Sequence, residues 1–221
     1  MYARLLDLRL APGATPAFAG LYRQRISPTL TATPGCLGAV ALAATGHEEK
    51  ILSLTLWRAA EAADAYDREG RFGQLLGETA SLFPGRDPDA DPLDDGGEEL
   101  VIEGYAAELA LPPALGRALS GVTFARTIVV EAAAGREEEI ERRAWAAVDR
   151  AAEEALGLVS IFLMRGLDRR ERTLVLGLWE SEEAAGRWER SEPYLALLRE
   201  LESAGLAAEI TPYRVLCAGA F

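Results

Sequence analysis

The clearest pattern in the chain is an alternation of leucine with other residues that occurs twice. It runs from Ile51 to Trp57 and again from Thr173 to Trp179, 122 residues later. Such alternation predicts a β-strand with two different faces. One face carries only leucine and is suited to a packed core. The other face carries mostly small residues and ends on tryptophan in both copies.

The strand faces that end on tryptophan leave two interpretations open. Small residues beside a large indole leave space next to the ring, and this space either forms a ligand cavity or receives a side chain from a packing helix. Tyr66 and Trp188 each lie nine residues beyond a strand-end tryptophan, where a helix can bring them close to it. Trp57, Tyr66, Trp179 and Trp188 therefore either line two aromatic pockets or belong to the core.

The residues around the first leucine strand predict the order strand, helix, strand, strand, helix, strand. The other three strands are expected at 2–10, 36–44 and 98–111, and the helices at 15–30 and 59–82. This order is that of a ferredoxin-like βαββαβ unit.

Local signals set the expected ends of these elements. Thr15 is expected to cap the first helix ahead of a proline, and Pro28 to kink or end that helix near residue 27. Gly70 is the expected interruption of the second helix. The polar residues 46–50 are expected to form a hairpin loop.

The same order recurs from residue 124 at a constant offset, without gaps up to the counterpart of residue 76. Arg4 corresponds to Arg126, and the turn residue Gly35 to Gly157. Such long agreement indicates an internal duplication. We predict a first repeat at 1–111 with an acidic Pro/Gly loop at 84–97, a connector at 112–122, and a second repeat at 123–221.

The second face of each predicted sheet is apolar as well, so it has to be covered. The other repeat is the simplest cover. The predicted fold is therefore α+β: two ferredoxin-like βαββαβ repeats whose antiparallel sheets pack together as an intramolecular barrel, with the helices outside.

Composition narrows the class of protein further. A net charge of −12 over 221 residues argues against nucleic acid and against anionic membrane surfaces as partners. No apolar run reaches the roughly 18 residues of a membrane helix. The two cysteines, Cys36 and Cys217, do not form a disulfide framework and are expected to be inert thiols. We expect a cytoplasmic protein.

The charged candidates also have alternatives. Arg4 and Arg126 begin equivalent strands, where they can clamp an anionic or carbonyl oxygen, lie at the barrel rim, or pair with a glutamate of the opposite repeat. His47 and its two neighbouring glutamates are not duplicated, which favours an exposed loop over a metal site. We expect no metal and no cofactor, and the sequence identifies no catalytic residue.

The order of elements, about a hundred residues per repeat, and a third strand that ends in tryptophan before a Ser/Glu/Ala-rich helix start (57–62 and 179–184) carry a family resemblance. The chain resembles the dimeric α+β barrel superfamily, and within it the antibiotic biosynthesis monooxygenase-like (ABM) domains. Members of that family usually pair two chains, so this chain looks like a fused pair. Further pairing into a homodimer stays open, because fusion need not cover every strand edge.

The resemblance implies cofactor-independent oxygenases of aromatic polyketides or haem-degrading oxygenases. The haem-degrading members use an asparagine on the first strand, the strand-end tryptophan and a histidine on the next helix. This chain has no asparagine, and its only histidine, His47, precedes the tryptophan. Haem degradation is therefore disfavoured. The asparagine on which the polyketide oxygenases rely is missing too.

Two functions remain. One is an ABM-like enzyme, a cofactor-independent monooxygenase, or a binder of a small aromatic or apolar compound. The other is a non-catalytic binding or assembly module with a degenerate pocket. The candidate substrate-binding residues are Trp57, Tyr66, Arg4, Trp179, Trp188 and Arg126.

Overall fold

The computed structural model describes residues 1–84, 100–111, 115–133 and 135–221. The chain divides into two compact units: unit 1 comprises 1–103 with 215–221, and unit 2 comprises 104–214. The predicted acidic loop lies outside the described residues except for its first residue, as does the start of the predicted connector. The repeat boundaries themselves stay a prediction.

The elements of the chain follow the predicted order in both repeats. The first repeat contains β1 (Tyr2–Arg9), α1 (Thr15–Leu21), η1 (Tyr22–Ile26), α2 (Ser27–Thr31), β2 (Cys36–Ala44), β3 (His47–Trp57), α3 (Ala60–Arg68), α4 (Arg71–Thr79), η2 (Ala80–Leu82) and β4 (Leu100–Leu111). After the short α5 (Leu115–Ala118) come β5 (Phe124–Glu131), α6 (Glu137–Glu154), β6 (Leu158–Gly166), β7 (Arg172–Trp179), α7 (Glu182–Glu189), α8 (Glu192–Ser203) and β8 (Ala208–Ala220).

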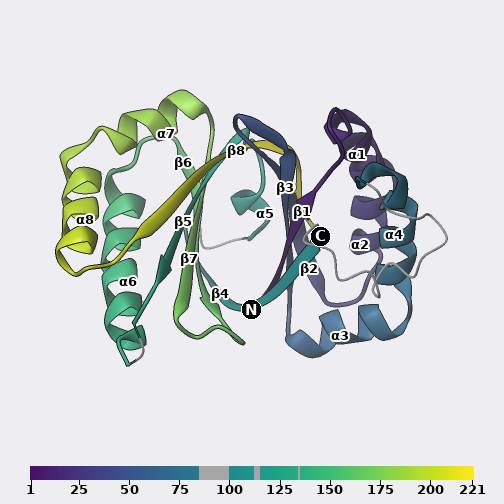
Figure 1. Cartoon of the computed structure of the whole chain (residues 1–221), viewed down its shortest axis with the longest axis horizontal. Helices are drawn as coiled ribbons and strands as arrows, with labels where there is room; N and C mark the ends of the chain where they lie inside the picture. The colour runs from purple at the N-terminus through teal and green to yellow at the C-terminus, as the bar shows by residue number, and fades with distance from the viewer. Residues whose placement is uncertain (85–99, 112–114, 134) are drawn as a thin grey trace. The chain divides into compact units, whose positions relative to one another are not determined.

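The eight strands are hydrogen-bonded in the order β1-β3-β2-β8-β5-β7-β6-β4, which closes into an antiparallel barrel. Within unit 1, helices α1 to α4 lie on one face of β1, β2 and β3, and within unit 2 helices α6 to α8 lie on one face of β5, β6 and β7 (Figure 1). Strands β4 and β8 contribute residues to both units. The predicted fold class is confirmed.

Strand register repeats between the two units. In unit 1, Arg4 of β1 lies opposite Thr55 of β3. In unit 2, Arg126 of β5 lies opposite Gly177 of β7. Each residue of the second pair lies 122 positions after its counterpart in the first pair. Each strand-end tryptophan therefore takes the same place in its sheet. The leucines of the alternating strands, at 52, 54, 56, 174, 176 and 178, are all buried, as their pattern predicts.

The first helix differs from the prediction in two ways. Ala14, not Thr15, is the N-cap residue, and the Thr15 hydroxyl instead donates to the Glu48 carbonyl at 2.6 Å. Of the two effects predicted for Pro28, a kink or an end, the end does not occur, because helical residues continue to Thr31. A π-helical segment, Tyr22–Ile26, lies directly before the proline-containing turn. We attribute the continuation to this wider turn, since proline lacks the N–H that a regular α-helix requires.

The first hairpin is tighter than predicted. Strand β3 begins at His47, so residues 47–50 belong to the strand and not to a loop. Ala44 pairs with His47, which leaves only two residues in the turn. The second of them, Gly46, has a φ of 82°, a left-handed conformation that glycine adopts without strain.

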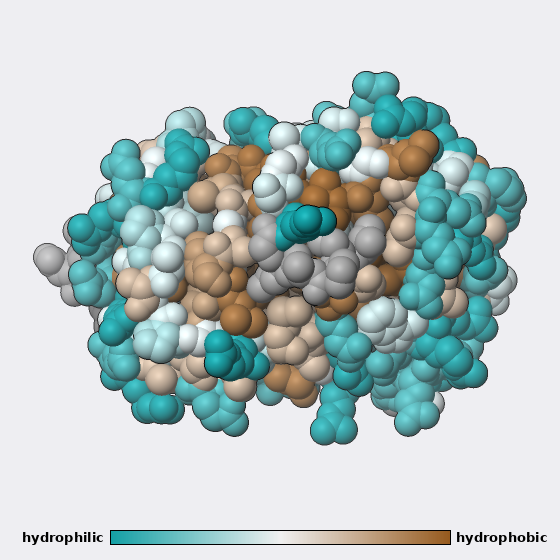
Figure 2. Space-filling view, turned by 180° about the vertical axis from the view of Figure 1, so that it is seen from behind, coloured by the Kyte–Doolittle hydropathy of each residue, from teal (hydrophilic) through white to brown (hydrophobic). Residues whose placement is uncertain are grey.

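Figure 2 shows hydrophilic residues over much of the face it views, with hydrophobic residues gathered nearer its centre. None of the helices in the described parts of the chain has the length and apolar character needed to cross a membrane.

Candidate functional site

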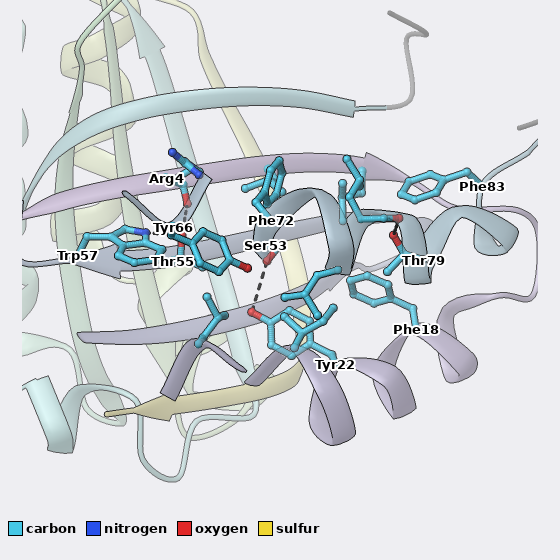
Figure 3. A pocket seen from close by; sticks show the side chains of 16 residues that line it. Arg4, Phe18, Tyr22, Ser53, Thr55, Trp57, Tyr66, Phe72, Thr79 and Phe83 are labelled. Carbon is cyan, nitrogen blue, oxygen red and sulfur yellow. Dashed lines mark hydrogen bonds between the residues drawn. The ribbon is translucent and has the colours of Figure 1, made fainter. Parts of the chain in front are cut away.

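Unit 1 holds a cavity between its helices and the tryptophan face of its strands. Its volume is about 60 Å³. Its floor consists of alternate residues of β1 and β3, and its walls come from the helices (Figure 3). The strand residues are Arg4, Leu6, Leu8, Ser53, Thr55 and Trp57; the helix side contributes Phe18, Tyr22, Ile26, Leu30, Tyr66, Phe72, Leu75, Leu76, Thr79 and Phe83.

A row of three aromatic rings forms one wall of this cavity. The fully buried Trp57 ring lies 5.3 Å from the Tyr66 ring, centroid to centroid, at an interplanar angle of 44°. Tyr66 in turn lies 6.2 Å from Phe72. Tilted contacts at these distances are favourable for aromatic pairs. The helix therefore brings Tyr66 beside Trp57, and both residues contribute to the core and to the cavity wall.

The neutral polar groups of the wall are mostly satisfied internally. The Trp57 indole N–H donates to the Thr55 hydroxyl at 2.9 Å, and the Tyr22 and Ser53 hydroxyls lie 3.4 Å apart. Thr79 donates to a backbone carbonyl of its own helix. Burial raises the pKa of Tyr22 and of Tyr66 above the ordinary tyrosine value, so both phenols stay protonated at neutral pH.

Arg4 forms a two-point ion pair with Asp67 of α3, with N–O distances of 2.6 and 2.7 Å. Its guanidinium carbon also lies 5.7 Å from the centre of the Phe72 ring. Burial lowers the pKa of Arg4, but the hydrogen bond and charge of Asp67, together with a smaller contribution from Tyr2, outweigh burial, so this pKa lies above its ordinary value. The carboxylate thus occupies two guanidinium nitrogens that an oxygen clamp would otherwise use.

The same ion pair occurs in unit 2, where Arg126 contacts Glu189 through two hydrogen bonds. Asp67 and Glu189 are themselves 122 residues apart. The partner of each arginine therefore comes from its own repeat, which corrects the alternative of a glutamate from the opposite repeat. The packed helix of the same repeat lies nearer to each arginine.

Replacing Asp67 with alanine is expected to lower the free energy of unfolding by about 2 kcal/mol, because Arg4 would keep its charge without a carboxylate partner. Arg4 is 6% exposed, whereas the Asp67 side chain is 40% exposed, which keeps the loss below the range of about 3–5 kcal/mol for fully buried pairs. Urea unfolding of wild type and variant measures the difference. Asp67→Asn, which keeps an acceptor oxygen, should lose less; equal losses would contradict this account.

Unit 2 places its predicted residues together as well. A cavity of about 40 Å³ lies beside Trp179 and is lined by Arg126, Gly177, Trp188 and Glu189, among others. A neighbouring cavity of about 70 Å³ shares part of this lining, including Trp188. The Trp179 indole nitrogen is buried and has no hydrogen-bond partner among the described residues. The two units therefore differ at the tryptophan itself.

Other chemically capable residues lie away from these cavities or are unreactive. The His47 side chain is 67% exposed and lies near Glu49. Burial raises the pKa of the Cys36 thiol to about 11, which disfavours the reactive thiolate. In the described ranges, no group of three or more His, Cys, Asp or Glu side chains is placed to hold a metal ion.

The sequence candidates did not include the cavity residues Tyr22 and Phe72, nor Asp67, the ion-pair partner of Arg4. Asp67 could have been found from the sequence, because an acidic residue recurs 122 positions later at Glu189, as Arg4 recurs at Arg126. Tyr22 and Phe72 had none beyond their places in helical apolar stripes, which are as typical of a core as of a pocket wall.

Comparison with known proteins finds the same family in both repeats. Residues 1–75 and 123–200 match the family described as antibiotic biosynthesis monooxygenase, once in each repeat. A search of curated proteins finds no match for the chain.

Several solved structures share the fold over nearly the whole chain. One described as a putative monooxygenase from Fusobacterium nucleatum has a TM-score of 0.77 at 9% identity and covers 99% of this chain and 94% of its own. A putative monooxygenase from Lactobacillus acidophilus has a TM-score of 0.72 at 12% identity, covering 100% and 97%. An anthrone oxidase-like protein has a TM-score of 0.63 at 12% identity, covering 99% and 92%. At these identities the likeness concerns the fold alone.

Proposed function

The chain belongs to the antibiotic biosynthesis monooxygenase family, and we propose that its unit 1 binds a small, flat, apolar compound beside Trp57. The observation that carries this proposal is the buried cavity with its row of aromatic rings. Rings of this kind favour stacking or edge contact with another flat ring. Burial of apolar ligand surface, at about 25 cal/mol per Å², supplies the driving force.

Charge and size define the ligand class. The charge of Arg4 is paired with Asp67, and the Trp57 N–H is already bound to Thr55, so neither group calls for an anionic ligand. The buried Arg4 Nε is the one nitrogen of this guanidinium without a hydrogen-bond partner among the described residues. A single water needs a cavity of about 10–15 Å³, so this cavity suits a compound of about one or two rings. The proposed ligand is therefore a neutral aromatic compound.

Binding is better supported than catalysis by the groups around the cavity. Removing a proton from a bound compound requires a base, but both cavity tyrosines hold their protons because burial raises their pKa values. The nearby carboxylate of Asp67 is held by Arg4. Within the part of the chain that the structure describes, the wall thus offers a ring-binding surface rather than an acid–base set.

Oxygenation at the same cavity is a second candidate function, which the descriptions of the structural relatives as putative monooxygenases or anthrone oxidase-like favour. The reaction would convert a ring methylene and O₂ into a ketone and water, with the substrate supplying the electrons. Oxygen uptake with anthrone as the probe measures it. Uptake no faster than in buffer would remove this candidate and leave the binding proposal standing.

The binding proposal is tested with indane, a neutral compound of two fused rings, titrated into ¹⁵N-labelled protein. We expect saturable movement of the Trp57 indole N–H signal, assigned with Trp57→Phe. Ser53→Leu should abolish the effect, because its larger side chain projects into the cavity that Ser53 lines. Ser53→Ala is the matched control, which loses the same hydroxyl without filling the space.

The result that would overturn the proposal is equally direct. If the Trp57 signal does not move up to the solubility limit of indane in a folded protein, the cavity is only a packing defect of the core. Binding that Ser53→Leu leaves unchanged would place the compound elsewhere.

A further inference from the structure

Helix α4, which forms part of the unit 1 cavity wall, is rich in glycine. Gly70 precedes it with a φ of 73°, and Gly73 and Gly77 lie within it. A methyl group added at Gly73 would have nothing within 4 Å, so packing does not require a glycine at this position. Glycine inside a helix gives the unfolded backbone more freedom and lowers helix stability relative to alanine. Helix α4 is therefore intrinsically weak.

The corresponding helix of unit 2 has none of these glycines. At the offset of 122 residues, α8 carries Glu192, Leu195 and Arg199 in their place. Glu192 and Arg199 form an ion pair along the helix, and the Ser191 hydroxyl caps its first turn by accepting from the Tyr194 N–H. The helix is also longer, with 12 residues against 9 in α4. The glycines are thus a feature of unit 1 and not a requirement of the fold.

Helix α4 also stands where the cavity wall is partly exposed. Of the described residues that line the unit 1 cavity, all are buried except Ile26 and Phe72. Ile26 belongs to η1, and Phe72 to the start of α4 (Figure 3). Because α4 also contributes Leu75, Leu76 and Thr79 to the wall, its displacement would uncover much of the cavity.

One ion pair joins α4 to the segment η1. Arg25 donates two hydrogen bonds to the Glu78 carboxylate, with N–O distances of 3.1 and 2.8 Å. These bonds, with a smaller contribution from Gln74, lower the pKa of Glu78, so this residue is charged at neutral pH. The Arg25 side chain is 56% exposed, so water and salt weaken the pair. In unit 2, Ala147 takes the place of Arg25, so this arginine has no counterpart there.

We propose that α4 is a lid over the unit 1 cavity, which opens about Gly70 to admit a ligand and which the Arg25–Glu78 pair holds closed. A left-handed glycine with open space around it can change its backbone angles without a clash. The two interior glycines lower the free energy of local unfolding of the helix. This inference rests on the proposed function for the ligand that passes the lid, but the opening itself needs no ligand.

The opening is measured by hydrogen exchange of the ligand-free full chain, followed by NMR. The Trp57 indole N–H is buried at the cavity, where it donates to Thr55, so it exchanges with solvent only when the cavity opens. We expect this indole and the amides of α4 to report the same opening. The amides of α4 should exchange at least about 10-fold faster than those of α8, because of the glycines.

Two variants should shift the opening in opposite directions. Arg25→Gln removes the charge that binds Glu78 and should raise the exchange rate of the α4 amides about two- to fivefold. Gly73→Ala strengthens the helix and should lower this rate about fivefold. Arg23→Gln is the matched control, because Arg23 lies on the same segment η1 but contacts the Leu216 carbonyl. It should leave the exchange of α4 unchanged.

Indane then connects the opening to the passage of a ligand. Because the lid closes over both the empty and the occupied cavity, Arg25→Gln should raise the rates of binding and release by the same two- to fivefold. The affinity should not change. The line shape of the Trp57 indole signal during the titration measures both rates and affinity.

Three results would overturn the inference. The first is exchange of the α4 amides no faster than that of the α8 amides. The second is a Trp57 indole whose exchange follows neither Arg25→Gln nor Gly73→Ala, and the third is an indane binding rate that neither variant alters. The failure of the function proposed for unit 1 is recognised separately, as the absence of indane binding, because hydrogen exchange without ligand still decides whether α4 opens.

Discussion

Replacing Trp57 with alanine is expected to lower the free energy of unfolding by about 3–5 kcal/mol, the range for losing a large buried aromatic. The Trp57 ring is fully buried and packs against Tyr66. The change would also leave the Thr55 hydroxyl without the donor that it now accepts from. Urea unfolding followed by far-ultraviolet circular dichroism measures the loss without relying on the fluorescence of the deleted residue.

Trp145→Ala provides the control for this prediction. Trp145 lies on α6 and is only partly buried, so the same chemical change should cost markedly less there. If the two variants lost the same stability, burial beside the cavity would not be what makes Trp57 important. A loss below about 1 kcal/mol for Trp57→Ala would mean that the unit 1 core collapses into the vacated space.

The position of Trp57 in the sheet was predictable from the sequence, because period-two alternation assigns faces without knowledge of the partner strands. The constant offset of 122 residues then fixed the second copy, and the structure repeats the same strand register in both units. The duplication was therefore the strongest information in the sequence. It also predicted that Tyr66 and Trp188 would lie near the strand-end tryptophans.

Other features required three-dimensional contacts. The pairing of Arg4 with Asp67 spans 63 residues, and an acidic residue on a helix is usually solvated, so the sequence could not select this one among many. The difference between Thr55 and Gly177 was visible in the sequence. Its meaning, a satisfied indole in one unit and an unsatisfied one in the other, depends on a side-chain rotamer that no pattern encodes.

The two repeats share the residues that hold sheet and helices together but differ in the residues that line their cavities. The arginine–carboxylate pairs and the turn glycines occur at equivalent positions of both repeats. The residues that line the two cavities have changed, with Thr55 replaced by Gly177 and Tyr66 by Trp188. A duplicated scaffold can therefore retain its packing while the linings of its two cavities diverge.

Packing at the turn glycines supports the last prediction. Gly35 precedes β2 with a φ of 84°, and a methyl group added to it would come within 2.6 Å of the Ala62 Cβ on α3. Real carbon atoms do not approach this closely, so α3 would have to move away from the sheet. Left-handed backbone costs a residue with a side chain about 1–2 kcal/mol, and overpacking adds about 1–3 kcal/mol. Gly35→Ala is therefore expected to lower the free energy of unfolding by about 2–5 kcal/mol.

Gly13→Ala is the matched control, because Gly13 has a φ of 79° with nothing within 4 Å of an added methyl group. It should lose only the backbone part, about 1–2 kcal/mol. The second repeat offers the same comparison: a methyl group at Gly157 would lie 2.7 Å from the Ala184 Cβ, whereas one at Gly135 meets open space. Urea unfolding of the four variants measures both differences. If the alanine variants at 35 and 157 were no less stable than those at 13 and 135, close helix packing would not be the reason for these glycines.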